Sequence, residues 1–337
     1  MTSLSGTVWR IVAKYAGAAV VLSLLVTVAC TKINTEPAEA PPAPEQKQEV
    51  LRTNEVFDKE KYKGLLTIRY FYLKGDVGTG DCILVQTPDG KTMMIDAGVH
   101  AAASQVIGYL NRLGVNTIDV ALNTHPHSDH IGGFATVAQM KDVKQFYMID
   151  LPYESSSAYN RSMNAIRAKN IPVKTLEEGD TFQLGNEVKV EVLSPPKGVL
   201  PGAVKNFETA EINNHSMVLK MTYKDNSFLI TGDIYNDREY QLVADVNGRL
   251  DSDMMDAPHH GHQTSSAVTF IRAVSPKMVA ISSNIFNSLQ VYNRYKKENA
   301  RIASTGLNGN ILITSDGKNL NMITEKDSAL DTMDQAS

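Results

Sequence analysis

The ten residues Thr124–Gly133 read Thr-His-Pro-His-Ser-Asp-His-Ile-Gly-Gly and follow the apolar run Val120–Leu122. A strand is expected to end where the polar side chains begin, and the glycine pair predicts a sharp turn after them. Imidazoles and a carboxylate at this density suit a divalent ion such as zinc or manganese. The alternative is a surface loop that happens to be rich in histidine. It is disfavoured because His-x-His-x-Asp-His is placed directly behind a buried strand.

The chain has 337 residues, of which 42% are hydrophobic, enough for one large domain or two small ones. Its formal net charge is −4. This balance argues against a protein that holds nucleic acid through a strongly basic surface, although a locally basic cleft stays open.

Residues 1–29 have the pattern of an export signal. Arg10 and Lys14 give a positive start, and Ala16–Ala29 is an almost unbroken apolar run. The run ends at Cys30 in a sequence that resembles the lipobox of bacterial lipoproteins. We therefore expect a lipidated Cys30 that anchors the protein to a membrane on the extracytoplasmic side of the bacterial cell envelope. A plain transmembrane anchor is the alternative.

Composition divides the rest of the chain. Residues 30–50 are rich in Pro, Glu and Ala and are predicted to be a disordered tether, with a folded domain over 51–328 and a disordered tail over 329–337. The second of two cysteines, Cys82, lies in an apolar run and is expected to be a small core residue, so no disulfide framework is predicted.

Hydrophobic periodicity predicts alternating strands and helices in the folded part. Strands are expected at 66–72, 82–87, 92–95, 120–122, 145–149, 188–193, 217–223, 228–230, 254–257, 278–282, 311–314 and 320–324. Helices are expected at 102–113, 134–140, 155–169 and 237–246, with one more between 257 and 278. This order favours an α/β protein in which sheets are covered by helices, a layered sandwich.

Further polar residues stand at the ends of other predicted strands. Asp96 stands within Met94-Ile-Asp-Ala-Gly98, and Asp233 ends Leu229-Ile-Thr-Gly-Asp233. His259, His260 and His262 follow the strand that begins at Met254. A rigid sheet can gather such side chains into one site.

These motifs resemble the metallo-β-lactamase superfamily. Within it, the chain is most similar to the soluble domain of the ComEC-type competence proteins and its exported relatives. The resemblance rests on Asp76–Leu84, Met93–Gly98, Thr124–Gly133, Asn213–Leu219, Phe228–Asp233 and Ala257–Gly261, in the family's order. It implies an αββα metallo-β-lactamase sandwich with two divalent metal ions, zinc or manganese, at one edge.

The resemblance also assigns roles to residues. It implies six metal ligands: His125 and His127 for one ion, Asp129 and His130 for the other, a bridging Asp233, and His259. His260 would donate a proton to the leaving group or contact substrate, so Asp129 and His260 are the expected catalytic residues. Asp81 and Asp96 are expected to support the loops, and His262 is a weaker candidate.

The chain departs from the superfamily pattern in two places. Relatives often have a histidine ligand before the strand at 217–223, where this chain reads Asn213-Asn-His-Ser216, and His215 is as well explained as a polar residue at a strand start. Relatives also often carry a His-Pro segment after the strand at 278–282, which this chain lacks. The second departure concerns a segment that shapes the substrate cleft.

The expected activity is hydrolysis of a phosphodiester, DNA or a smaller diester, by a metal-bridged hydroxide. The alternative is a non-enzymatic, metal-containing binding module tethered to the envelope. A basic strip, Arg294–Arg301, offers a contact for a nucleic acid backbone, but such a strip is also typical of a solvated helix face. Protein partners and the native metal are left open.

Overall fold

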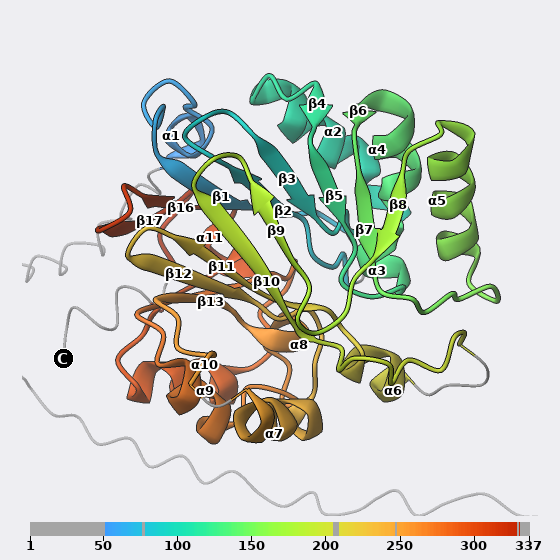
Figure 1. Cartoon of the computed structure of the whole chain (residues 1–337). Coiled ribbons are helices and arrows are strands. Elements are labelled where there is room, and N and C mark those ends of the chain that lie inside the picture. The colour runs from blue at the N-terminus through green and yellow to red at the C-terminus, as the bar shows by residue number, and fades with distance from the viewer. Residues whose placement is uncertain (1–50, 76–77, 205–208, 247, 329, 331–337) are drawn as a thin grey trace, which may run out of the picture. The chain divides into compact units, whose positions relative to one another are not determined.

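The computed structural model describes residues 51–75, 78–204, 209–246, 248–328 and residue 330, which form two large sheets (Figure 1). Within these residues the first sheet has eight strands, in the order β17-β16-β1-β2-β3-β5-β7-β8. Their bounds are β1 Leu66–Tyr70, β2 Ile83–Gln86, β3 Thr92–Ile95, β5 Val120–Leu122, β7 Phe146–Met148, β8 Val173–Thr175, β16 Ile311–Ser315 and β17 Leu320–Thr324. The strands from β3 to β8 pair in parallel, and the others are antiparallel.

The second sheet, over the same described part of the chain, has seven strands in the order β15-β14-β13-β12-β11-β10-β9. Their bounds are β9 Thr181–Leu184, β10 Val188–Ser194, β11 Val218–Tyr223, β12 Asn226–Ile230, β13 Met254–Asp256, β14 Met278–Ile281 and β15 Arg301–Ser304. The strands from β12 to β15 are parallel. A short parallel pair joins β4 Thr117–Ile118 to β6 Asp142–Val143.

Helices cover the outer face of each sheet (Figure 1). The outer face of the first sheet carries α2 Ala103–Arg112, α4 Phe134–Met140 and α5 Ser157–Ala168. The outer face of the second carries α7 Asn236–Asp245, α9 Val268–Val274 and α10 Leu289–Lys297. Shorter helices are α1 Thr53–Val56, η1 His100–Ala102, α3 Ser128–Ile131, α6 Thr209–Asn214, α8 Pro258–Gly261 and α11 Thr305–Asn308. The predicted αββα sandwich is confirmed.

Strand alternation builds this layering. Met94 of β3 packs with the helices, whereas Met93 and Ile95, its neighbours, pack into the layer between the sheets. In the second sheet, Leu229 of β12 faces the helices, and Phe228 points inward. Successive side chains of a strand point to opposite faces, so a strand buried on both sides is apolar throughout. This explains why these strands are short continuous apolar runs.

Most predicted elements occur within one or two residues of their expected ends, including the hairpins β2–β3 and β16–β17. Cys82 is a buried free thiol, as expected. The basic strip is not one helix face, because α10 ends at Lys297 and Arg301 begins β15. None of the described helices is both long and apolar enough to span a bilayer. The predicted signal, the tether with Cys30, and the tail apart from Leu330 lie outside the described residues.

Candidate metal centre

The segments predicted to carry ligands converge at one edge of the sandwich. β5 leads into α3, β12 leads into residues 231–235, and β13 leads into α8 (Figure 1). β3 pairs in parallel with β5 in the first sheet, and β12 pairs in parallel with β13 in the second, so within each pair the carboxyl ends lie at one edge. The 3.2 Å contact between His130, after β5, and Asp233, after β12, shows that the two edges meet. This is the edge at which open α/β sheets commonly present their sites.

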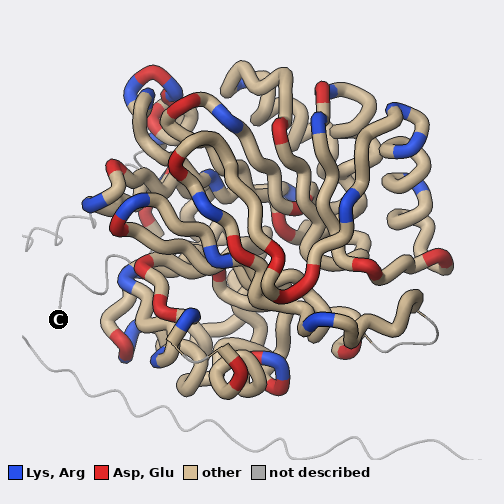
Figure 2. The backbone as a smooth tube through the Cα atoms, in the orientation of Figure 1, with Lys and Arg blue, Asp and Glu red and all other residues tan. Residues whose placement is uncertain are grey.

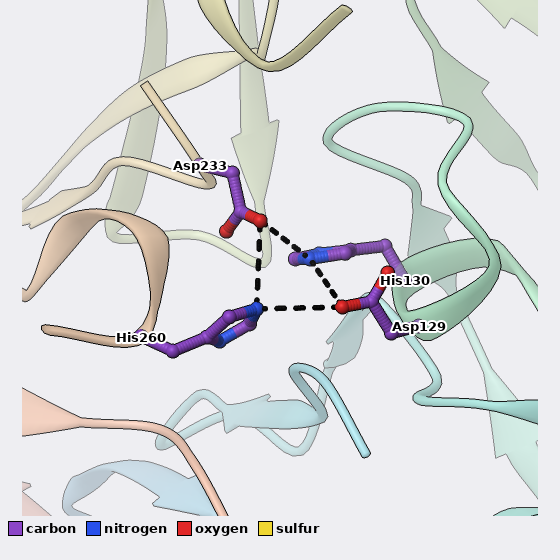
Figure 3. A group of neighbouring side chains, drawn as sticks. All are labelled: Asp129, His130, Asp233 and His260. Carbon is purple, nitrogen blue, oxygen red and sulfur yellow. Dashed lines mark ion pairs between the residues drawn. The ribbon is translucent and has the colours of Figure 1, made fainter. Parts of the chain in front are cut away.

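Four side chains from three loops form one group (Figure 3), namely Asp129, His130, Asp233 and His260. His130 Nε2 lies 3.2 Å from Asp233 Oδ2 and 3.9 Å from Asp129 Oδ2. His260 Nε2 lies 3.4 Å from Asp233 Oδ2 and 3.6 Å from Asp129 Oδ2. Two imidazole nitrogens and two carboxylates thus face one another with their ligand atoms within 4.8 Å.

The opposite edge of each imidazole is held by a carboxylate. His130 Nδ1 lies 2.7 Å from Asp96 Oδ2, and His260 Nδ1 lies 3.0 Å from Asp81 Oδ1 and 2.9 Å from the Ser282 carbonyl oxygen. Because a carboxylate or carbonyl oxygen only accepts, each Nδ1 carries the hydrogen. The Nε2 atoms that face the group are therefore free to present lone pairs, as in carboxylate–histidine–metal arrangements.

The inward-facing atoms fit a cation. His130 Nε2, His260 Nε2 and Asp233 Oδ1 are buried, and they have no hydrogen-bond partner among the described residues. Buried polar atoms rarely go without a partner, and unpaired lone pairs next to carboxylates are especially costly. A divalent ion bound by imidazole and carboxylate would satisfy all of them at once.

Electrostatics leads to the same requirement. Burial alone would lower the pKa of His260, but Asp233 and Asp81 outweigh it and raise that pKa well above its usual value. Burial would also lower the pKa of His130, but Asp233 and Asp96 outweigh it and raise that pKa well above its usual value. Burial would raise the pKa of Asp233, yet His260 and His130 hold it well below its ordinary value. The group therefore demands positive charge, which protons or a cation would supply.

A second group lies beside the first. His125 Nε2 and His127 Nδ1 are 3.0 Å apart, and His125 Nε2 is 3.8 Å from Asp233 Oδ2. The other nitrogen of His125 contacts the Thr124 hydroxyl at 3.1 Å, and that hydroxyl donates to Asp96 at 2.6 Å. Burial, followed by the neighbouring His130, lowers the pKa of His125 well below its usual value. Both imidazoles thus suit a second ion, with Asp233 between the two groups.

Glycines allow the loops to pack this closely. A Cβ on Gly133, the second glycine of the histidine motif, would lie 2.0 Å from the Ala97 carbonyl oxygen. Gly80 has φ +73°, and a Cβ there would lie 1.6 Å from the Asp129 carbonyl oxygen. Side chains other than hydrogen are excluded at both positions, so the histidine loop could not pack on Ala97, nor the Gly80 loop on Asp129, without them.

Five of the six predicted ligands come together, and His259 does not. His259 and His260 have φ values of 51° and 55°, so consecutive side chains swing in different directions. His260 enters the group, whereas His259 Nδ1 contacts the Thr264 hydroxyl at 2.7 Å and its ring lies against Tyr235, with centroids 4.7 Å apart. Burial lowers the pKa of His259 to about 4. Its ring is therefore neutral at neutral pH.

The remaining candidate residues are not placed as metal ligands. Asp81 and Asp96 support the histidines, as described above. His215 follows α6 outside both groups and borders a different cavity, with Glu211 and Arg238. Thr124, Thr264 and the Ser282 carbonyl also contact site histidines, and no sequence signal indicated them, because Ser and Thr at loops usually cap turns.

A pocket of about 180 Å³ opens beside the first group. It is lined by residues 78–80, by three histidines and by the loop after β14, namely His259, His260, His262, Ser283, Ile285 and Asn287. Ile285 is 58% exposed and gives this pocket an apolar wall.

Two curated relatives each match about 70% of this chain. The chain is 25% identical over 258 residues to ComE operon protein 3 of Bacillus subtilis, covering 70% of this chain and 32% of that protein. It is 27% identical over 241 residues to Competence protein ComA of Neisseria gonorrhoeae, covering 69% and 30% respectively. The chain therefore spans about a third of the length of these relatives. A shorter match, 32% over 74 residues, links it to Exodeoxyribonuclease YycJ of Bacillus anthracis, covering 22% of this chain and 28% of that protein.

The family comparison covers most of the sandwich. The model of the metallo-beta-lactamase superfamily matches residues 75–281, from the loop before β2 to the end of β14. This range contains every residue of both ligand groups. The chain belongs to the metallo-beta-lactamase superfamily.

Proposed function

We propose that this protein is a metal-dependent phosphodiesterase whose two ligand groups each bind a divalent ion. One ion would be held by Asp129, His130, Asp233 and His260, and the other by His125, His127 and Asp233. The observation that carries the proposal is the pair of buried, unpaired Nε2 atoms facing two carboxylates. Zinc suits this donor set, and manganese suits its carboxylate-rich half.

Two bound divalent ions would supply an activated water and would neutralise charge that develops on the phosphoryl oxygens. The chain's own residues prepare the site for this chemistry. Asp96 and Asp81 fix the ring orientation of His130 and His260, so that both Nε2 atoms point inward. Asp233 reaches both groups through one carboxylate.

Asp129 marks the side from which substrate would approach. Its side chain is 31% exposed, whereas those of His130 and Asp233 are 0% and 4% exposed. The pocket bordered by His260 and Ile285 lies beside the same group. We therefore place the substrate between Asp129 and this pocket, and Asp129 keeps the direct part in catalysis expected of it.

We revise the roles of the adjacent histidines. His260 was expected to act on substrate and His259 to bind metal, but the contacts of His260 with Asp129 and Asp233 support a ligand role for His260. His259 borders the pocket and has its Nδ1 engaged by Thr264. It is the better candidate for contact with substrate.

The relatives and the surface support the proposed substrate class. The nuclease among the relatives supports a phosphodiester, and the competence proteins support DNA as a candidate. Lys and Arg are interspersed with Asp and Glu along the described backbone (Figure 2). Arg294 of the basic strip donates to the carbonyl oxygens of Ser265 and Ser266. This mixture of positive and negative charges favours a small diester or single-stranded DNA as substrate, over a DNA duplex bound along its length.

The proposed location is the cell envelope, with the domain anchored outside the cytoplasm through lipidated Cys30. Its support is the sequence pattern of residues 1–30.

The decisive experiment is a hydrolysis profile of the purified protein loaded with zinc or manganese. The substrates are single-stranded DNA, double-stranded DNA and bis(p-nitrophenyl) phosphate, and Asp233→Ala and chelated protein are the controls. We expect diester hydrolysis that needs metal and is lost in Asp233→Ala. A protein that binds two ions yet hydrolyses none of these substrates would instead support the non-enzymatic binding module. Hydrolysis that survives in metal-free protein would exclude the proposed mechanism.

A further inference from the structure

Arg69 of β1 is a buried positive charge that has only neutral hydrogen-bond partners. Its side chain is 1% exposed, and burial lowers its pKa to about 10, so the guanidinium is still charged at neutral pH. Its Nε donates to the Val56 carbonyl oxygen at 2.9 Å, and its Nη1 donates to Thr67 Oγ1 at 2.9 Å and Gln86 Oε1 at 3.0 Å. None of the described residues forms an ion pair with it. A buried charge without a counter-ion is costly, so this arrangement calls for an anion.

Hydrogen-bond donors beside Arg69 lack an acceptor. No hydrogen bond joins Arg69 Nη2 to another of the described residues. A guanidinium only donates, so the Gln86 amide turns its oxygen toward Arg69 and presents its Nε2 elsewhere. That Nε2 likewise makes no hydrogen bond within the described part of the chain. Both N–H groups are therefore available to a ligand that accepts hydrogen bonds.

A cavity of about 410 Å³ borders Arg69 and Gln86, and it lies away from the metal centre. It is lined by the loop after α1, by β1 and by residues 86–90, which end β2 and form the turn to β3. Gln86 pairs with Thr92, the first residue of β3, whereas Asp96 follows the last residue of that strand. β1 is antiparallel to β2, so the loop before β1 lies at the same end as this turn. The cavity and the metal centre are thus at opposite ends of these strands.

Lysines add positive charge to the lining of the cavity. Lys59 and Lys63 line it together with Arg69, and no ion pair joins either lysine to a carboxylate of the described residues. Lys61, between them in the sequence, does not line the cavity and pairs instead with Glu55. The basic residues at the cavity are therefore those that lack a carboxylate partner.

Two acidic residues also line the cavity, and one of them is already engaged. Asp89 accepts from the backbone N–H of Asn186 at 2.9 Å, in the turn between β9 and β10, and from the Thr87 hydroxyl. These contacts hold the Asp89 carboxylate at that turn. Glu60 is then the one carboxylate in the lining that is free to oppose three positive charges.

We propose that this cavity binds a dianionic phosphate group, either free or as a monoester, through Arg69, Gln86, Lys59 and Lys63. The excess of two positive charges over Glu60 matches a phosphate monoester, which carries about −1.5 to −2 at neutral pH, better than a carboxylate. Guanidinium, ammonium and amide N–H groups are also the donors that phosphate oxygens accept from. The site is separate from the metal centre, and it does not depend on the proposed function.

Calorimetric titration of the full chain with inorganic phosphate tests the site, with chelator present so that no metal ion contributes. We expect one phosphate per chain. Lys59→Gln/Lys63→Gln should weaken binding about tenfold, the scale of two exposed charge pairs. Lys61→Gln/Lys74→Gln is the matched control, because it removes the same charge from lysines that do not line the cavity. Equal weakening in the two double variants, or no binding in the unmodified protein, would overturn the inference.

A second variant and other ligands test the buried charge and the ligand class. Arg69→Met should abolish phosphate binding, and the double lysine variants keep the test decisive if Arg69→Met does not fold. Acetate, with one charge, should bind at least about tenfold more weakly than phosphate, the scale of one lost ion pair to a buried partner; equal binding would contradict a phosphate site. Dihexanoyl phosphatidic acid, a soluble lipid, identifies the source. Tighter binding of this lipid than of phosphate supports a lipid headgroup, and the reverse supports a free phosphate.

Discussion

At the scale of the single residue, Asp96 orders the site although it is not itself a proposed ligand. Asp96 Oδ1 accepts from Asn123 Nδ2 and the Thr124 backbone N–H, and Oδ2 accepts from the Thr124 hydroxyl and His130 Nδ1. All four donors are buried together with Asp96. An amide in its place would turn an N–H group toward one of these donors.

We expect Asp96→Asn to lower metal affinity about 10- to 100-fold, the usual cost of losing a partner that orients a histidine ligand. Calorimetric titration with zinc checks this. Asp142→Asn, at an exposed carboxylate paired with Lys144, is the matched control and should bind as the unmodified protein does. Equal zinc affinities in all three proteins would show that Asp96 does not orient the His130 ligand.

The adjacent histidines give a second prediction at this scale. His260→Ala should lose at least one of two bound ions, because His260 Nε2 faces Asp129 and Asp233. His259→Ala should retain both ions, since its Nδ1 is engaged by Thr264. The metal content of the two variants, measured after gel filtration, shows which of the two histidines binds metal. The opposite pattern would restore the roles expected from the sequence.

Sequence alone could place most of this site but not all of it. Five proposed ligands were expected, because strand ends and spacing made them candidates and the family resemblance implied their ligand role. His259 and His260 are neighbours of the same residue type, and only their left-handed backbone decides which one enters the group. That conformation is rare outside glycine, and no residue pattern marks it here.

At the scale of the element, the loop 78–80 closes over Asp129 through the conformation of Gly80. Gly80→Ala should displace the Asp129 loop, because the added Cβ would lie 1.6 Å from a carbonyl oxygen at φ +73°. We expect weaker metal binding and a loss of activity. Gly78→Ala is the control, since a Cβ there meets no atom within 4 Å. Comparable metal binding in the two variants would show that the loop is not fixed by Gly80.

The start of α9 supplies a pH-dependent element. Glu239 of α7 is fully buried and accepts the backbone N–H groups of Ser266 and Ala267, which precede α9. Burial raises the pKa of Glu239 from 4.5 to about 7. A raised pKa means that the folded state holds the proton more tightly. The contribution of protonated Glu239 to the free energy of unfolding is therefore complete below pH 4.5. It is lost as the pH rises toward 7.

We expect the free energy of unfolding of the unmodified protein to fall relative to that of Glu239→Gln between pH 5 and pH 8, because glutamine does not titrate. Each unit of pKa shift corresponds to about 1.4 kcal/mol. Urea unfolding at both pH values, with chelator present so that metal loss does not contribute, measures the difference. A difference that does not change with pH would exclude Glu239 as the titrating group.

Strands were predictable from the sequence where burial imposes a hydrophobic pattern. β3 and the Phe228–Ile230 part of β12 are largely apolar and covered on both sides, and both strands were expected at nearly their observed ends. β8 was missed because its three residues are exposed at the sheet edge and carry no apolar signal. β15 was missed because Arg301–Ser304 is short and begins with a basic residue. Pairing with β14, and not local preference, makes this segment a strand.

At the scale of the whole molecule, the first prediction concerns anchoring. Cys30→Ser should leave the protein unlipidated, because only the thiol can accept the diacylglycerol group. Mass spectrometry of the N-terminus and membrane fractionation measure this. If the variant and the unmodified protein have the same processing and distribution, the lipoprotein assignment is wrong and a transmembrane anchor explains the apolar run better.

The site is assembled from loops of both sheets, and this has a consequence for how the protein acquires its ions. The supporting and ligand residues run from Asp81 to His260, so the site does not exist until β13, late in the chain, has joined the second sheet. A chain that crosses a membrane unfolded would arrive on the far side without bound metal. The choice of metal would then be made by the ions available where folding ends and not where synthesis occurs, so the same polypeptide refolded with manganese or with zinc should retain whichever ion is present at that moment.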